Sequence, residues 1–178
     1  MTITDFFREA VAKEEGGVVI IAGSNSDKKH IEEIVENLER YSLPYEVCIA
    51  SAHKQPSEVL GLISEYDGLH VPLAYITIAG GTDALSGMVA QHSLYPVISC
   101  PPDAPNESCV KNPPGSSNAY VAHPKNAARF VAQMFSFING KCERALKEEL
   151  KSRIITLETA DRELQKAYAE RQLAHEQK

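Results

Sequence analysis

Short apolar runs of strand length alternate along this chain with stretches that have helical periodicity. The runs cover residues 18–22, 45–50, 73–78 and 96–99, and the first is continuously apolar and rich in β-branched side chains. A continuous run of this kind is typical of a strand that is covered on both faces. Between the runs, apolar residues recur every three or four positions, as on one face of a helix. Strands that alternate with helices indicate parallel strands joined by crossovers.

The expected fold class is therefore α/β, an open parallel sheet with helices on both faces. This is the three-layer sandwich of flavodoxin-like and Rossmann-like proteins, in which right-handed crossovers place helices on both faces of the sheet. A short fifth strand is expected at 120–122, after a proline-rich stretch, 101–114, that we expect to be an extended loop. A helix is also expected over 4–14, with an inner side formed by Phe6, Phe7, Ala10 and Val11.

Three regions are expected: an N-terminal helix over 1–15, an α/β catalytic domain over 16–140 and a long C-terminal amphipathic helix over 141–178. The last region has neither proline nor glycine, and its apolar residues follow helical steps. These residues are Leu146, Leu150, Ile154, Leu157, Leu164 and Tyr168. Because so long a helix cannot bury its whole stripe on one small domain, we expect it to pack on a neighbouring subunit. The alternative is a helix wrapped on its own domain.

Charge and cysteine spacing exclude several classes of function. Eighteen basic against 24 acidic side chains give a net charge of −6, so no nucleic-acid partner is expected. No apolar run approaches the roughly 18 residues of a membrane span, and the N-terminal sequence is unlike a secretory signal. Metal-ligand and disulfide-framework spacings are lacking, which favours reduced thiols in a cytoplasmic protein without metal; the cysteines are Cys48, Cys100, Cys109 and Cys142.

Residues that suit an anionic ligand follow three of the expected strands. In open parallel sheets, ligands bind beyond the carboxyl ends of the strands. The first strand is followed by Gly23-Ser24-Asn25-Ser26-Asp27. Its hydroxyls and the first amides of the next helix can bind a phosphate, and Asp27 can accept two hydrogen bonds from sugar hydroxyls. The alternative is that Ser26 or Asp27 only caps the helix.

The second and third strand ends add a titratable group and a pair of glycines. Ser51-Ala52-His53-Lys54 combines a hydroxyl, an imidazole that can move protons near neutral pH and a cation that can hold a phosphate. Gly80-Gly81 lets backbone N–H groups approach a carboxylate or carbon dioxide closely. Each motif alone also suits an ordinary loop or cap, but three on consecutive strand ends favour one anion-binding site.

Taken in order, these motifs resemble the PurE family of purine biosynthesis. The resemblance spans about residues 17–138 and is carried by the segments 23–27, 44–47, 51–54, 78–80, 95–102 and 126–128. Enzymes of this family form 4-carboxy-5-aminoimidazole ribonucleotide. The resemblance implies a small-molecule substrate, no metal or organic cofactor, and a homo-oligomer that is an octamer or a tetramer.

The resemblance also implies a role for each motif residue. His53 is the implied catalytic group, which removes the proton from the ring carbon of the substrate. Asp27 is implied to hold the ribose hydroxyls. The ribose phosphate is implied to bind Ser24, Ser26, Ser51 and Lys54, and the carbon dioxide pocket is implied to be lined by Gly80, Gly81 and Ser86.

The family has two branches, and two positions of this sequence favour one of them. One branch carboxylates 5-aminoimidazole ribonucleotide with carbon dioxide; the other is a mutase that moves a carboxylate from an exocyclic nitrogen to the ring carbon. The mutase branch typically has an arginine where this sequence has Lys54 and a histidine where it has Ala84, so direct carboxylation is the expected function. The mutase reaction is the second hypothesis. A third, of another class, is a domain that binds a nucleotide phosphate without chemistry.

Overall fold

The computed structural model describes residues 3–176, with side chains through His175. Two compact units divide the chain, residues 1–143 and 144–178. The first unit is an α/β sandwich, and the described part of the second is helical. Within the described residues, no helix is both long and apolar enough to cross a membrane.

Five parallel strands form the sheet of the first unit, in the order β2-β1-β3-β4-β5. They are β1 (Gly17–Ala22), β2 (Tyr45–Ile49), β3 (Leu73–Ile78), β4 (Val97–Ser99) and β5 (Ala119–Tyr120). Every residue of β1 and β3 is buried, as expected for strands covered on both faces. Strand order reverses between β1 and β3, which makes the crevice beside their carboxyl ends the usual ligand site of such sheets.

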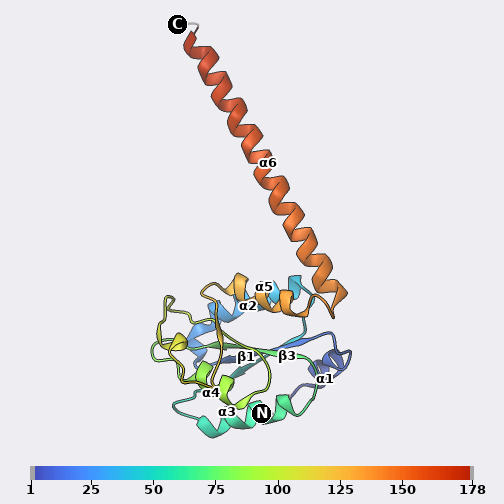
Figure 1. Ribbon diagram of the computed structural model, residues 1–178, viewed down its shortest axis with the longest axis vertical. Helices are drawn as coiled ribbons and strands as arrows, with labels where there is room; N and C mark the ends of the chain where they lie inside the picture. The colour runs from blue at the N-terminus through green and yellow to red at the C-terminus, as the bar shows by residue number, and fades with distance from the viewer. Residues whose placement is uncertain (1–2, 177–178) are drawn as a thin grey trace. The chain divides into compact units, whose positions relative to one another are not determined.

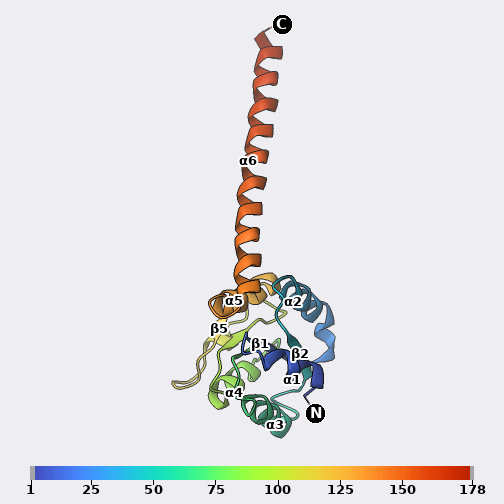
Figure 2. The same ribbon diagram turned by 90° about the vertical axis from the view of Figure 1, so that its right-hand side faces the viewer.

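Helices cover both faces of this sheet. In Figure 1 and Figure 2, α2 (Lys28–Arg40) and α5 (Pro124–Phe135) lie on one face, and α3 (Pro56–Asp67) and α4 (Leu85–His92) lie on the other. Two short 3-10 turns complete the unit, η1 (Asn25–Asp27) and η2 (Ser108–Val110). The predicted three-layer α/β fold is confirmed.

The first helix, α1 (Asp5–Val11), packs beside the start of β1. Gly17 allows this approach, since a Cβ there would lie 2.5 Å from Val11 Cγ1. Phe7 is buried, with its ring centroid 6.0 Å from that of Tyr66 in an edge-on contact. Phe6 is 76% exposed, so its expected inward position is wrong. Adjacent helical residues point about 100° apart, and so short a helix buries only the narrow stripe of Phe7 and Val11.

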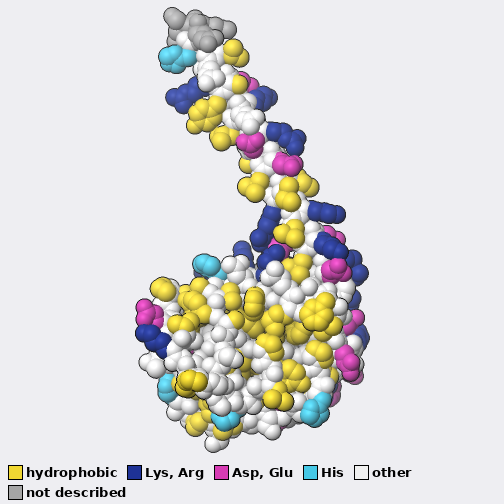
Figure 3. Space-filling model, in the orientation of Figure 1, with side chains coloured by type: hydrophobic (Ala, Val, Ile, Leu, Met, Phe, Trp, Pro, Cys, Tyr) yellow, Lys and Arg dark blue, Asp and Glu magenta, His cyan; other side chains and the backbone are white. Residues whose placement is uncertain are grey.

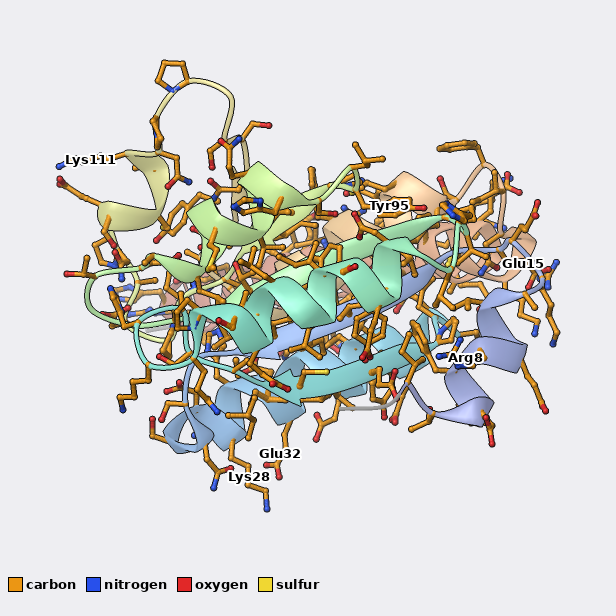
Figure 4. All side chains as sticks on the ribbon, turned by 90° about the horizontal axis from the view of Figure 1, so that it is seen from below. Arg8, Glu15, Lys28, Glu32, Tyr95 and Lys111 are labelled. Carbon is orange, nitrogen blue, oxygen red and sulfur yellow. The ribbon has the colours of Figure 1, made fainter. Side chains whose placement is uncertain are left out.

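The two ends of the strands lie at opposite edges of the unit. Figure 4 labels Arg8 and Glu15 at the edge where β1 begins, and Lys28 and Lys111 toward the edge where it ends. The proline-rich stretch 101–114 is not wholly extended, contrary to expectation, because η2 interrupts it. This turn forms where the side chain of Asn106 accepts a hydrogen bond from Ser108 N (3.0 Å).

The last helix, α6 (Gly140–Glu176), is continuous, which confirms the long C-terminal helix. Along it, Lys, Arg, Asp and Glu alternate with hydrophobic side chains (Figure 3). Beyond Leu146, which is buried, the apolar stripe predicted from the sequence is uncovered, with exposed fractions from 49% at Leu150 to 71% at Leu157. Surface ion pairs such as Glu158–Arg162 (3.5 Å) support the helix only weakly.

Ile76 tests how far the fold depends on its central strands. It lies fully buried on β3, between β1 and β4. We expect Ile76→Ala to lower the free energy of unfolding by about 2–5 kcal/mol, because it leaves a cavity in a close-packed core. Leu94→Ala is the control, since Leu94 is 95% exposed, and we expect a change below about 0.5 kcal/mol. Equal effects of the two variants in urea unfolding would contradict this assignment of the core.

Candidate active site

Three strand ends form one pocket at the carboxyl edge of the sheet. In the ladder, Ala22 of β1 pairs with both Ile49 of β2 and Ile78 of β3, so the residues that follow emerge side by side. The pocket has a volume of about 120 Å³. Its lining residues are Gly23, Ser24, Asp27, Ser51, Ala52, His53, Ala79, Gly80, Thr82, Ala84 and Leu85.

Five of the nine site residues predicted from the sequence line this pocket, namely Ser24, Asp27, Ser51, His53 and Gly80. The other four do not line it, although they lie in or next to the same three loops; they are Ser26, Lys54, Gly81 and Ser86. The three loops singled out from the sequence therefore meet at one pocket, but the sequence could not tell which residues of each loop line it.

The loop after β1 gathers two hydroxyls and a carboxylate. The Oγ atoms of Ser24 and Ser26 lie 2.8 Å apart, and Ser26 Oγ donates to Asp27 Oδ1 at 3.2 Å. Ser24 Oγ also accepts from Ser26 N at 3.1 Å and so caps η1. Asp27 stands at the N-cap position of α2 but makes no side-chain cap bond to that helix. Its carboxylate is left to face the pocket.

The loop after β2 presents His53 to the pocket. Gln55 N donates to Ser51 O at 2.8 Å, and Lys54 N donates to Ser51 Oγ at 3.3 Å, so the turn is closed around Ser51. His53 and Lys54 are both exposed at this turn. His53 lines the same pocket as the loops that follow β1 and β3, where its imidazole can exchange a proton with a bound ligand.

The loop after β3 differs from the expectation that both glycines offer their N–H groups to a ligand. Gly80 and Thr82 line the pocket, but Gly81 N donates to Asp103 Oδ2 at 2.7 Å. Gly81 has a φ of +66°, a conformation that glycine adopts at little cost. Ser86 is fully buried in the first turn of α4, and its Oγ has no hydrogen-bond partner among the described residues.

Asp83 ties this loop to the sheet and to α4. Its Oδ1 accepts from Ser86 N at 2.9 Å, and its Oδ2 accepts from Ser99 Oγ at 3.0 Å. Asp83 N donates to Ser108 Oγ at 2.8 Å. Asp83 is buried, and the bonds from Ser86 N and Ser99 Oγ satisfy a carboxylate that would otherwise be costly to bury.

A second hollow adjoins the pocket and was not predicted. It has a volume of about 310 Å³ and is lined by Ser26, Asp27, Lys29, His30, Glu33 and Pro102. His30, for which the sequence indicates no role in a site, lies with Nε2 3.0 Å from Cys100 O and 3.3 Å from Cys100 Sγ. Burial raises the pKa of the Cys100 thiol to about 12, so the sulfur stays protonated at neutral pH and does not act as a nucleophile.

The site has the parts of an anion-binding enzyme site that uses a side-chain base. No three His, Cys, Asp or Glu side chains of residues 3–176 gather as a metal would require. Hydroxyls and the start of a helix follow β1, an imidazole follows β2, and a glycine loop follows β3. The fold and this pocket together define a flavodoxin-like α/β protein with a pocket at its topological switch point, the place where sheets of this kind bind small molecules.

Comparison with known proteins identifies the family. The family model described as AIR carboxylase matches residues 17–154, and the chain belongs to this family. The crystal structure of Treponema denticola PurE superposes with a TM-score of 0.79 at 35% identity, covering 84% of this chain and 98% of that one. The crystal structure of a variant of Treponema denticola PurE2 gives a TM-score of 0.78 at 34% identity, with the same coverage of both chains.

Two named relatives illustrate the similarity in sequence. The phosphoribosylaminoimidazole carboxylase of Treponema denticola is 37% identical over 141 residues, which are 76% of this chain and 89% of that protein. The human bifunctional phosphoribosylaminoimidazole carboxylase/phosphoribosylaminoimidazole succinocarboxamide synthetase is 33% identical over 153 residues. This match covers 83% of the present chain but only 36% of the human protein.

Replacing Asp83 tests whether its hydrogen bonds stabilise the loop after β3. We expect Asp83→Ala to lower the free energy of unfolding by about 1–3 kcal/mol, because the first turn of α4 loses its acceptor and a buried hydroxyl loses a partner. Thr82→Ala is the control, since Thr82 is its exposed neighbour. A thermal unfolding experiment that ranks Thr82→Ala as the more damaging change would rule out this role for Asp83.

Proposed function

We propose that this protein carboxylates 5-aminoimidazole ribonucleotide with carbon dioxide to give 4-carboxy-5-aminoimidazole ribonucleotide in purine biosynthesis. The observation that carries the proposal is the single pocket in which His53 lies with Ser24, Asp27 and Ser51. Membership of the AIR carboxylase family supports the same reaction class. The proposed enzyme is a lyase that needs no metal or organic cofactor.

In the proposed reaction, the protein has two tasks: to hold the nucleotide and carbon dioxide next to each other, and to accept one proton. The electron-rich ring carbon attacks carbon dioxide, a carbon–carbon bond forms, and one C=O electron pair moves to oxygen to give the carboxylate. The ring carbon then gives its proton to His53, which restores the aromatic ring. Holding the two reactants together in a small pocket lowers the barrier by removing the cost of bringing them together.

The smaller pocket and the second hollow, which share Asp27, together suit this substrate. In the proposal, the smaller one, of about 120 Å³, takes the reacting end beside His53, Gly80 and Thr82. The ribose phosphate binds the hydroxyls of Ser24, Ser26 and Ser51 with Lys54, and Asp27, which lines both hollows, holds the ribose hydroxyls. Gly81 and Ser86, which the sequence assigned to the carbon dioxide pocket, do not line the smaller pocket.

The mutase reaction is the second candidate, since the same residues could receive the N-carboxy isomer. Lys54 and Ala84 favour direct carboxylation over it. A domain that binds the nucleotide without chemistry is the third candidate. The imidazole of His53 argues against that one, because it adds little to phosphate binding beyond what Ser51 and Lys54 supply.

A paired assay separates the three candidates. One reaction contains 5-aminoimidazole ribonucleotide with carbon dioxide, and the other contains freshly prepared N-carboxy isomer. We expect turnover only in the first. Direct conversion in the second would establish the mutase, and ligand binding without turnover in either would establish the binding domain.

His53 is the residue whose loss the proposed reaction cannot tolerate. We expect His53→Asn to lower kcat by about 100-fold or more, because the amide cannot take the proton, and to change nucleotide affinity little. The control is His123→Asn, since His123 lies at the start of α5 and outside the pocket. Equal turnover of the His53 variant and the unmodified protein would exclude His53 as the base.

We also propose that the protein is a homo-oligomer in the cytoplasm, and that α6 packs on a second copy. The exposed apolar stripe that includes Leu157 and Leu164 supports the contact between copies, because such a stripe is stable in water when covered. Free, buried thiols at all four cysteines suit a reducing compartment.

Measuring the mass by light scattering tests whether the apolar stripe of α6 forms the contact between copies. We expect the unmodified chain to have a mass at least twice the 19.5 kDa of one chain. The variant Leu157→Glu/Leu164→Glu should lower that mass, because it buries charge at the contact. The variant Thr156→Glu/Gln165→Glu adds the same charge beside the stripe and should not lower it. A monomeric unmodified chain would contradict the proposal.

A further inference from the structure

The backbone of Gly81 is held by side chains from a distant loop. Asp103 Oδ2 accepts from Gly81 N at 2.7 Å, and Asn106 Nδ2 donates to Gly81 O at 2.9 Å. Both polar groups of Gly81 are therefore bound by residues that follow β4, more than 20 positions along the chain. Asp103 also approaches Gly80 closely, since a Cβ on Gly80 would lie 3.4 Å from Asp103 Cγ.

The side chains of Asp103 and Asn106 are hydrogen-bonded to each other, with Asn106 as the donor and Asp103 as the acceptor. Asn106 Nδ2 donates to Asp103 Oδ1 at 3.0 Å. Asn106 Oδ1 accepts from Ser108 N at 3.0 Å and from Ser108 Oγ at 2.6 Å, which fixes the orientation of its amide. Asp103 is thus required as an acceptor twice, toward Gly81 and toward Asn106. A carboxylate can do this, whereas an amide offers only one oxygen.

The bonds to Gly81 lower the pKa of Asp103, because the Gly81 N–H and then the Asn106 amide stabilise the ionised carboxylate. At neutral pH the carboxylate is therefore charged and able to accept both bonds. Charge-assisted bonds of this kind are stronger than those between neutral groups.

The held peptide lies between two residues of the pocket wall. Gly80 and Thr82, which flank Gly81, line the pocket together with His53. Asp103, Asn106 and Ser108 do not line it. Their effect on a ligand must therefore pass through the Gly80–Thr82 backbone.

We propose that Asp103 and Asn106 form a clamp that positions the Gly80–Thr82 wall against the reacting end of the substrate. This inference rests on the proposed function for its effect on turnover. The clamp acts on the wall beside the reacting carbon and leaves the hydroxyls that bind the phosphate untouched. It therefore governs kcat more than affinity for the nucleotide.

The decisive variant is Asp103→Asn, which keeps the shape and removes one acceptor. If its oxygen stays on Gly81 N, its NH2 group faces the NH2 group of Asn106. We expect kcat to fall by about 10- to 100-fold, because small misplacements of reacting groups cost this much, and nucleotide KM to change less than about 3-fold. Amide hydrogen exchange in a peptide covering residues 79–84 should become faster.

Two further variants make the test specific. Asn106→Asp keeps the shape and removes the donor to both Gly81 O and Asp103, and we expect it to lower kcat and to speed exchange at 79–84 as Asp103→Asn does. Glu107→Gln is the control, because it removes a carboxylate from the same loop whose ion pair is with exposed Lys111 at 2.8 Å. We expect it to behave as the unmodified protein does.

Hydrogen exchange separates failure of the clamp from failure of the proposed function. If the unmodified protein turns over neither substrate, the proposed function fails, while faster exchange in both Asp103→Asn and Asn106→Asp still supports the clamp. Unchanged exchange at 79–84 in Asp103→Asn would overturn the clamp whatever the activity. So would an equal effect of Glu107→Gln, or unchanged exchange at 79–84 in Asn106→Asp.

Discussion

The parallel register of β1 with both of its neighbours is the constraint on which the site depends. Its hydrogen bonds continue past the strand ends, where Gly23 N donates to Ile78 O at 2.8 Å and Ala50 N donates to Ala22 O at 2.9 Å. The segments that follow β1, β2 and β3 therefore leave the sheet side by side, at the same position along the strands. A slip of one residue would turn each strand's side chains to the opposite face. Buried apolar strands thus fix the spacing of polar groups that they do not contact.

The three loops at this edge are stabilised in different ways. The first two are closed by bonds within the loop, from Ser26 N to Ser24 Oγ and from Lys54 N to Ser51 Oγ. The third has few bonds of its own and is held from outside, by Asp103 and by Ser108. The groups that suit a phosphate therefore lie on locally closed turns, whereas the glycine wall of the pocket depends on how the segment after β4 is folded.

This difference explains what could be predicted from the sequence. The strands, the layers and the loops after β1, β2 and β3 follow from local periodicity, and five predicted residues do line the pocket. The bond between Gly81 and Asp103 joins residues 22 positions apart, and the one between His30 and Cys100 joins residues 70 positions apart. No local pattern marks such pairs. The sequence alone therefore assigns the Gly81 N–H to the ligand, although a carboxylate of the chain itself already holds it.

The conformation of Gly81 also links the residue type at position 81 to the residue types at positions 103 and 106. At a φ of +66° its N–H and C=O face Asp103 and Asn106, and a residue with a side chain adopts this conformation only under strain. A relative that replaces Gly81 must relax the peptide, and both polar groups then turn away from their partners. Asp103 would be left without its donor, so positions 81, 103 and 106 are expected to change together.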